Sequence, residues 1–293
     1  LGLLWVLSVG WRFDVAIYRH FLRPGKNLKR YGEWAVVTGA TDGIGRAYAF
    51  ELARKGLSVL LISRTESKLV EVEKEIKSKY PNVSVSHLAI DYSKFDTAAQ
   101  GKVSAALASK DVGILVNNVG VSYPHPKFFD ELTDEEMQGL IELNVQSTVL
   151  MTRITLPLMV NQKRGAIVNL ASGAAVNPTA LLSGYSGAKG FVVKLSESLN
   201  VEMAPKGIHV PLMVATKLAK VRRASWDIPS PKSYASAAVA AIGYERTTSP
   251  YWSHALQLWA MDALPFFLVN KVVTTMHLNL RKRALKKAAA KKE

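Results

Sequence analysis

The chain has 293 residues, of which 48% are hydrophobic, 21% charged and 9% aromatic. This composition excludes disordered, collagen-like and simple coiled-coil chains. The chain has no cysteine, which excludes disulfides, thiolate zinc sites, iron–sulfur clusters and cysteine nucleophiles.

The net charge of +15 gathers at the two ends of the chain. Residues 1–31 carry six Lys and Arg against one Asp, and residues 281–293 carry seven against one Glu. Nucleic-acid binders usually carry a basic face on the folded domain itself. Basic ends beside apolar segments therefore favour an anionic membrane surface as the partner and disfavour nucleic acid.

The first predicted element is the apolar stretch 1–11. Eleven residues are too few to span a bilayer, which needs about 20. Because the chain begins with Leu1 and not methionine, we expect this stretch to be the end of a longer transmembrane helix, with Trp11 and Arg12 at the interface. A signal-peptide remnant and a core segment are the alternatives. Residues 1–31 are predicted to form a membrane-anchoring segment and a basic linker.

Short apolar runs then alternate with amphipathic helical patterns. The runs predicted as strands are 34–38, 59–63, 83–90, 113–117 and 166–171. The helical patterns between them lie near 44–55, 66–79, 95–109 and 133–161. Continuously apolar strands that alternate with helices indicate a parallel sheet covered on both faces. The predicted fold class is α/β, a Rossmann-like doubly wound parallel sheet with helices on both faces.

The later elements are less regular. A long helix is predicted over 183–204, and the strand expected over 208–214 contains Pro211, which is disfavoured in a central strand. We therefore expect this sixth strand to be short. A helix is predicted over 234–242, and the apolar, aromatic region 252–280 is typical of a partly membrane-embedded helical pair. The predicted divisions of the chain are the anchor and linker 1–31, a catalytic core 32–216, a substrate-covering helical region 217–280 and a basic tail 281–293.

A glycine-rich turn follows the first predicted strand. The sequence Thr-Gly-Ala-Thr-Asp-Gly-Ile-Gly occupies residues 38–45 and opens the first predicted helix. Glycines at Gly39, Gly43 and Gly45 allow a sharp turn and close approach of a pyrophosphate to the helix N-terminus. This pattern predicts a dinucleotide site, although an ordinary glycine turn is the alternative.

The second predicted strand ends in Ser63 and Arg64, where NAD-binding proteins place an acidic residue. A guanidinium binds a 2′-phosphate through charge-assisted hydrogen bonds. The expected cofactor is therefore NADPH/NADP+, and a solvated arginine at a helix start is the alternative.

Tyr185 and Lys189 are four residues apart in a predicted helix and so share a face. A neighbouring ammonium lowers the pKa of a phenol, which would make Tyr185 a usable acid or base. Ser172 follows a predicted strand and Asn118 ends another, so both are expected at the ligand-binding edge of the sheet. Asn144 is predicted in the helix that follows.

Together these motifs resemble the short-chain dehydrogenase/reductase family over about residues 34–216. The motifs that carry the resemblance are TGATDGIG, NNVG, Asn144, Ser172 and YSGAK. The segments LISRTESKL, NNVGVSYPHPKFF, PLMVATKLAKVRRAS and GYERTTSPYW are most similar to very-long-chain 3-oxoacyl-CoA reductases of fatty acid elongation, especially plant-like ones. Related steroid 17β-dehydrogenases look similar and are the alternative.

The resemblance implies NADPH-dependent reduction of a long-chain 3-oxoacyl-CoA to the 3-hydroxyacyl-CoA. It implies that Tyr185 donates a proton, Ser172 binds the carbonyl oxygen, Lys189 lowers the pKa of Tyr185 and binds the nicotinamide ribose, and Asn144 positions a water. The cofactor-binding residues that it implies, besides Tyr185 and Lys189, are Gly39, Thr41, Asp42, Gly43, Ile44, Gly45, Arg64, Asp91, Asn118, Gly120, Val214 and Thr216. It also implies an endoplasmic reticulum membrane protein with a cytosolic core, elongase partners and a homodimer.

The chain differs from the family in its sixth strand. Family members have several more residues in this strand before the proline, whereas here Pro211 follows Val210 directly. A true deletion there would damage the wall near the nicotinamide, so a non-catalytic elongase scaffold stays open as a hypothesis. The cations Lys217, Lys220 and Arg223 follow Thr216, and we expect them to grip the phosphates of CoA, with a solvated or membrane-facing basic helix as the alternative. No histidine spacing predicts a metal site.

Overall fold

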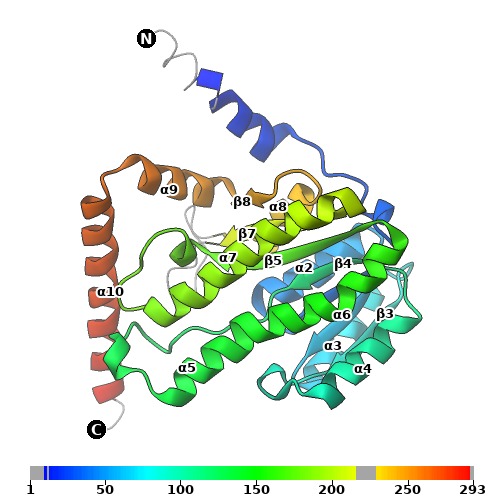
Figure 1. The fold of residues 1–293 in the computed structure, drawn as a ribbon, viewed down its shortest axis with the longest axis horizontal. Helices are drawn as coiled ribbons and strands as arrows, with labels where there is room; N and C mark the ends of the chain where they lie inside the picture. Colours follow the sequence, from blue (N-terminus) through cyan, green and yellow to red (C-terminus); the bar gives the residue numbers. More distant parts are fainter. Residues whose placement is uncertain (1–9, 12, 216–228, 291–293) are drawn as a thin grey trace.

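The computed structural model describes residues 10–11, 13–215 and 229–290 (Figure 1). Its centre is a parallel sheet in the order β3-β2-β1-β4-β5-β7-β8, with β6 also pairing β5. The strands are β1 Trp34–Thr38, β2 Ser58–Ser63, β3 Val85–Ala89, β4 Val112–Asn117, β5 Gly165–Ser172, β6 Ile208–His209, β7 Leu212–Ala215 and β8 Thr247–Thr248. The strand order reverses between β1 and β4, which is where such sheets open a crevice for a ligand.

Helices cover both faces of the sheet, as the alternation of apolar strands and helices predicts. The helices are α2 Gly43–Arg54, α3 Glu66–Lys79, α4 Thr97–Ala108, α5 Asp134–Ile141, α6 Ser147–Gln162, α7 Ser183–Met203, α8 Pro231–Ala241, α9 Trp252–Ala263 and α10 Phe266–Ala289. One apolar layer contains residues of α2, α3 and α8, and the other contains residues of α4, α6 and α7. Because strand side chains alternate between faces, Ala35 and Val37 join the first layer and Val36 the second.

The sixth strand is interrupted at Val210 and Pro211, which divide it into β6 and β7. Gly165 of β5 pairs with Ile208 and Ser172 pairs with Ala215, with one register from β6 through β7. Pro211 lacks an N–H, so the ladder loses one donor there. Its carbonyl nevertheless accepts from the Asn169 N–H at 3.1 Å. Because a proline removes a donor and not an acceptor, segment 208–215 runs alongside the whole of β5.

The helix predicted over 133–161 is divided in two by a π-helical turn, Glu142–Gln146. Asn144 lies in this turn and is fully buried. Single π-helical turns inside helices occur frequently at functional sites. The π-helical turn therefore carries Asn144, the residue of this helix that the sequence analysis names as a candidate site residue.

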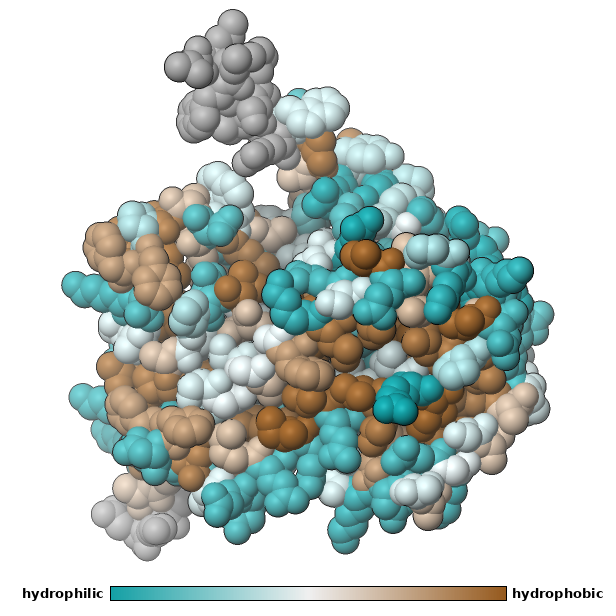
Figure 2. Space-filling view, in the orientation of Figure 1, coloured by the Kyte–Doolittle hydropathy of each residue, from teal (hydrophilic) through white to brown (hydrophobic). Residues whose placement is uncertain are grey.

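The C-terminal region consists of α9 and α10, which meet at a corner. Large apolar side chains are exposed around this corner, as Figure 2 shows. They include Trp259, Leu264, Phe266 and Phe267. Within the described part of the chain, no helix combines the length and the apolar content that crossing a bilayer requires. The predicted transmembrane stretch 1–11 lies almost wholly outside the described residues.

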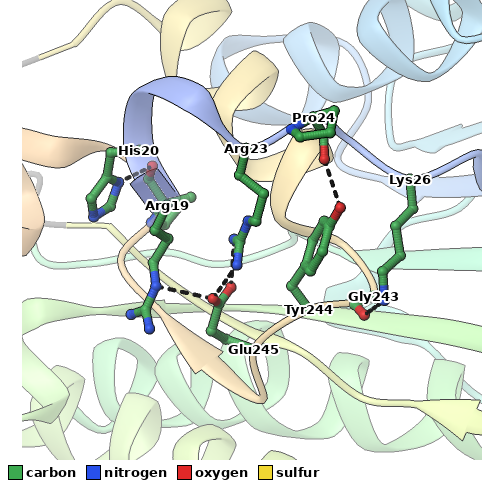
Figure 3. A network of polar contacts seen from close by, with 9 residues as sticks. Arg19, His20, Arg23, Pro24, Lys26, Gly243, Tyr244 and Glu245 are labelled. Atoms are coloured by element: carbon green, nitrogen blue, oxygen red, sulfur yellow. Dashed lines mark hydrogen bonds and ion pairs between the residues drawn. The ribbon is translucent and has the colours of Figure 1, made fainter. Parts of the chain in front are cut away.

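The basic linker is docked onto the loop between α8 and α9 (Figure 3). The Arg23 guanidinium donates two hydrogen bonds to the Glu245 carboxylate, one of them 2.8 Å long, and Arg19 adds an ion pair at 3.0 Å. The Tyr244 hydroxyl donates to the Pro24 carbonyl at 2.7 Å. Farther along, Leu28 and Tyr31 are buried in the main core, although the sequence places the domain boundary at residue 31. The described part of the linker is thus packed against the sheet domain.

We expect Glu245→Gln to lower the free energy of unfolding by about 2 kcal/mol, because it leaves Arg19 and Arg23 without their partly buried partner. Burial opposes ionisation of Glu245, but the Arg23 hydrogen bond and the charges of Arg19 and Arg23 lower its pKa overall. A lowered pKa in the folded protein stabilises above the ordinary value of 4.5 and loses that effect as the pH falls. Urea unfolding at pH 7 and below pH 4 measures both effects.

Glu75→Gln is the matched control, because the Arg46–Glu75 ion pair is about 40% exposed on both sides. We expect this control to change the free energy of unfolding by less than about 1 kcal/mol. Equal losses in the two variants, or a Glu245→Gln loss that persists in acid, would contradict a structural role for the linker contact.

Candidate active site

The glycine turn that opens α2 lies at the carboxyl end of β1. Gly39 and Gly43 have φ angles of 63° and 54°, a region that side chains disfavour. A Cβ at Gly45 would lie 2.2 Å from the Gly39 carbonyl oxygen, so only glycine fits there. Asp42 caps α2 by accepting from the Gly43 N–H at 2.7 Å. The turn therefore places the N-terminus of α2 at the carboxyl edge of the sheet, as the sequence predicts for a pyrophosphate site.

Asn118 holds this turn in place. Its side-chain amide donates to the carbonyls of Thr38 at 3.0 Å and Gly39 at 3.2 Å. Its own N–H donates to the Thr38 hydroxyl at 3.0 Å. The resemblance implies that Asn118 flanks the adenosine ribose, and the contacts in the structure assign its side chain to bracing the glycine turn between β1 and β4.

The other predicted cofactor residues lie at the adjoining strand ends. Arg64 is exposed just after β2, and the Ser63 hydroxyl is 2.9 Å from that of Thr41. Asp91 follows β3 and accepts from the Ser93 N–H and hydroxyl. Burial opposes ionisation of Asp91, but the Ser93 hydrogen bonds and the charge of Arg64 lower its pKa. Arg64 is thus a cation at this edge, and β2 ends at Ser63 without an acidic residue.

Ser172 and Tyr185 meet at the end of β5. Ser172 is the last residue of this fully buried strand and is 8% exposed. Its side chain is hydrogen-bonded to that of Tyr185, which lies in the first turn of α7. The structure therefore brings together a phenol and a hydroxyl that are thirteen residues apart in the sequence, at the edge where ligands bind.

Lys189 and Asn144 converge beside Gly120. The Lys189 ammonium donates to the Leu170 carbonyl at 3.1 Å, and the Asn144 amide donates to the Val121 carbonyl at 2.9 Å. A Cβ at Gly120 would lie 3.1 Å from Lys189 Nζ and 2.7 Å from Asn144 Oδ1. The buried side chains of Lys189 and Asn144 thus both lie against Gly120 of the loop after β4.

The pKa of Tyr185 differs from the value that the sequence analysis expects. Burial raises the pKa of Tyr185 above 10, while the Ser172 hydrogen bond opposes this rise. Burial lowers the pKa of Lys189 from 10.5 to about 8. The expected lowering of the Tyr185 pKa by Lys189 is therefore absent from the structure. The physical reason is that desolvation disfavours the charged form of both groups, and the ammonium is bound to the Leu170 carbonyl.

One predicted cofactor residue, Val214, is not part of this cluster. Val214 lies within β7, is 3% exposed and packs against Ala171 and Val192. Continuous pairing with β5 draws it into the apolar core and away from the open edge. The remaining predicted residues, Thr216, Lys217, Lys220 and Arg223, lie outside the described residues.

A buried amide chain beneath the site was missed by the sequence reasoning. Asn117 of β4 donates to the Asn169 side chain of β5 at 2.8 Å and to the Thr152 hydroxyl at 3.1 Å. Asn169 donates to Ser196 of α7 at 2.8 Å. Buried polar networks of this kind link the elements that they join, here β4, β5, α6 and α7. The available signal was two asparagines inside otherwise apolar strand runs, because unpaired amides are rarely buried.

Comparison with known proteins yields one family. The family model described as short chain dehydrogenase matches residues 33–225. The chain is 44% identical over 291 residues to very-long-chain 3-oxoacyl-CoA reductase-B of Danio rerio, which covers 97% of this chain and 91% of the relative. It is 42% identical to inactive hydroxysteroid dehydrogenase-like protein 1 of Homo sapiens, over 88% of this chain and 80% of the relative. The structure of a short-chain dehydrogenase from Sphingobium yanoikuyae in complex with NADPH aligns with a TM-score of 0.67 at 28% identity, covering 78% of this chain and 92% of that one.

Proposed function

Because the chain belongs to the short-chain dehydrogenase family, we propose that it reduces the 3-keto group of long- and very-long-chain 3-oxoacyl-CoA to the 3-hydroxyacyl-CoA with NADPH. The observation that carries this proposal is the convergence of Asn144, Ser172, Tyr185 and Lys189 at one edge of the sheet. The likeness to a 3-oxoacyl-CoA reductase over 97% of the chain supports the substrate class.

The residues at the carboxyl edge of the sheet fit NADPH. Positive φ angles at Gly39 and Gly43 and the N-terminus of α2 suit a pyrophosphate. Arg64 suits a 2′-phosphate because its guanidinium can bind phosphate oxygens. The end of β2 carries no carboxylate that would repel this phosphate. Asp91 would meet the adenine, Gly120 the ribose, and Lys189 the nicotinamide ribose. The related Sphingobium yanoikuyae structure, which contains NADPH, supports this assignment.

The side chains then divide the chemistry. NADPH supplies a hydride to the ketone carbon when bound. Tyr185, kept protonated by its raised pKa, donates its phenolic proton to the developing alkoxide. Ser172 hydrogen-bonds the same oxygen and stabilises its growing charge. Lys189, whose pKa of about 8 is near neutrality, returns a proton toward Tyr185 with Asn144 beside it.

Two alternatives are tested by one assay. The human relative named inactive at 42% identity favours a non-catalytic elongase scaffold, and a 17β-hydroxysteroid dehydrogenase is the other enzyme candidate. NADPH oxidation is measured with a long-chain 3-oxoacyl-CoA and, in parallel, with a 17-ketosteroid. Turnover of the acyl-CoA alone supports the proposal, and turnover of the steroid alone favours the 17β-hydroxysteroid dehydrogenase. If neither substrate is turned over, both enzymatic functions are contradicted.

We further propose that the protein works at the endoplasmic reticulum membrane with its core facing the cytosol, beside other elongase components and as a homodimer. The aromatic and aliphatic side chains exposed on the linker and at the α9–α10 corner, flanked by basic residues, support contact with a lipid surface. The divisions 1–31, 32–216, 217–280 and 281–293 remain part of this proposal. Sedimentation with anionic vesicles tests it, and equal recovery without vesicles would contradict membrane binding.

A further inference from the structure

The first turn of α7, which carries Tyr185, has no cap of its own. The N-cap residue Leu182 forms no side-chain cap. The first N–H groups of a helix have no acceptor within the helix and need one from elsewhere. The Tyr185 N–H donates to the hydroxyl of Tyr123, which lies in the loop after β4, at 3.2 Å. Tyr123 is 7% exposed. The backbone of Tyr185 is thus held by a side chain from the loop after β4.

The residues just before α7 are strained and held from two sides. Leu181 has a φ angle of 64°, a conformation that is uncommon for residues with a side chain. Its carbonyl accepts from the Lys127 N–H at 3.0 Å. The preceding carbonyl, of Ala180, accepts from Nδ1 of His277 at 2.9 Å. Strained positions persist only where their surroundings impose them, and they cluster at active sites.

His277 belongs to α10 and is 1% exposed. Burial lowers its pKa and the Ala180 bond opposes this, so the ring is neutral near pH 7 with its proton on Nδ1. One turn farther along α10, Arg281 donates to the Glu131 carboxylate at 2.6 Å and to the Pro126 carbonyl at 3.3 Å. The same side of α10 therefore binds the loop after β4 and the loop after β5, which border the candidate site (Figure 1).

We propose that His277 of the C-terminal helix and Tyr123 are positioning residues, which fix the start of α7 and thereby the reach of the Tyr185 hydroxyl. Neither touches the reacting atoms in this account. They act through the backbone of residues 180–185, which they hold in a conformation that the segment does not favour by itself. The role in turnover rests on the proposed function, whereas the tether itself does not.

The experiment compares His277→Leu, which removes the donor, with His277→Asn, whose amide nitrogen can occupy the position of Nδ1. Tyr123→Phe removes the second tether and keeps the ring. We expect the Leu and Phe variants to lose about 10- to 100-fold in kcat, because small displacements of a reacting group are costly. The KM for NADPH should stay within about twofold, since the glycine turn and Arg64 are remote from these tethers. The Asn variant should recover most of the loss.

Two measurements distinguish a misplaced Tyr185 from a general loss of stability of the protein. A misplaced proton donor makes proton transfer slower, so the solvent deuterium isotope effect on kcat should rise in His277→Leu and Tyr123→Phe. The matched control is His20→Leu, which removes a similar Nδ1 contact to a carbonyl, that of Pro250 at 3.2 Å, on the linker. We expect this control to leave kcat and the isotope effect unchanged. A kcat of His277→Leu equal to that of the control would overturn the proposal.

The tether, meaning the contacts of Tyr123 with the Tyr185 N–H and of His277 with the Ala180 carbonyl, can also be tested without measuring turnover. Hydrogen exchange of the amides of residues 185–188 should quicken in His277→Leu and stay unchanged in His20→Leu. If the parent protein turns over no ketone, the proposed function fails while the exchange measurement still decides the tether. If His277→Leu does not fold, Tyr123→Phe carries the same test. Unchanged exchange in the Phe variant would overturn the tether itself.

Discussion

Tyr185→Phe is expected to lower kcat by roughly 10²–10⁴-fold, the usual contribution of a general acid. The ring keeps its place in the first turn of α7, while the phenolic proton and the hydrogen bond to Ser172 are lost. NADPH binding should survive, because the glycine turn and Arg64 are untouched. Stopped-flow turnover with a 3-oxoacyl-CoA, together with NADPH fluorescence titration, measures the two properties separately.

Tyr234→Phe serves as the control for this variant. Tyr234 is a fully buried phenol of α8, on the face of the sheet covered by α2 and α3. Its replacement should leave kcat within about twofold, because the ring packing is conserved. If Tyr185→Phe behaved like Tyr234→Phe, another group would have to supply the proton.

Arg64→Asp is expected to raise the KM for NADPH by about 10- to 100-fold, since charge-assisted hydrogen bonds to a phosphate are among the strongest polar contacts. The new carboxylate would repel the 2′-phosphate and could accept from the 2′-hydroxyl of NADH. The preference should therefore shift toward NADH. Initial rates with each cofactor at a saturating ketone concentration provide the measurement.

A second charge reversal controls for long-range electrostatics. Lys79 lies at the far end of α3 and is exposed, so Lys79→Asp alters the net charge by the same amount as Arg64→Asp. We expect it to leave both cofactor constants nearly unchanged at physiological salt, where distant charges are screened. An NADPH constant that Arg64→Asp does not alter would mean that another residue binds the 2′-phosphate.

Much of the fold could be predicted from the sequence because its signals are local. The strand expected at residues 34–38 and the helix expected at 66–79 have the same bounds in the structure. A run that is apolar at every position is typical of a strand buried on both faces, and the period of a helix is written into successive residues. The glycine turn is similar, because Gly39, Gly43 and Gly45 satisfy steric demands set within a few residues.

The tertiary structure alone decided the remaining features, because they depend on partners distant in sequence. The two strands on either side of Pro211 keep one register because β5 supplies a full-length neighbour and Asn169 an N–H donor. Desolvation, which raises the pKa of Tyr185 and lowers that of Lys189, arises from side chains packed by several elements. Tyr123 and His277 approach α7 from loops and helices 62 and 97 residues away from their partners. The sequence by itself thus predicted the strands and helices of the sheet domain, the glycine turn and the candidate site residues. Only the folded chain determined the electrostatic environment of those residues and the contacts that hold them, because burial and hydrogen-bond partners are properties of the packed whole.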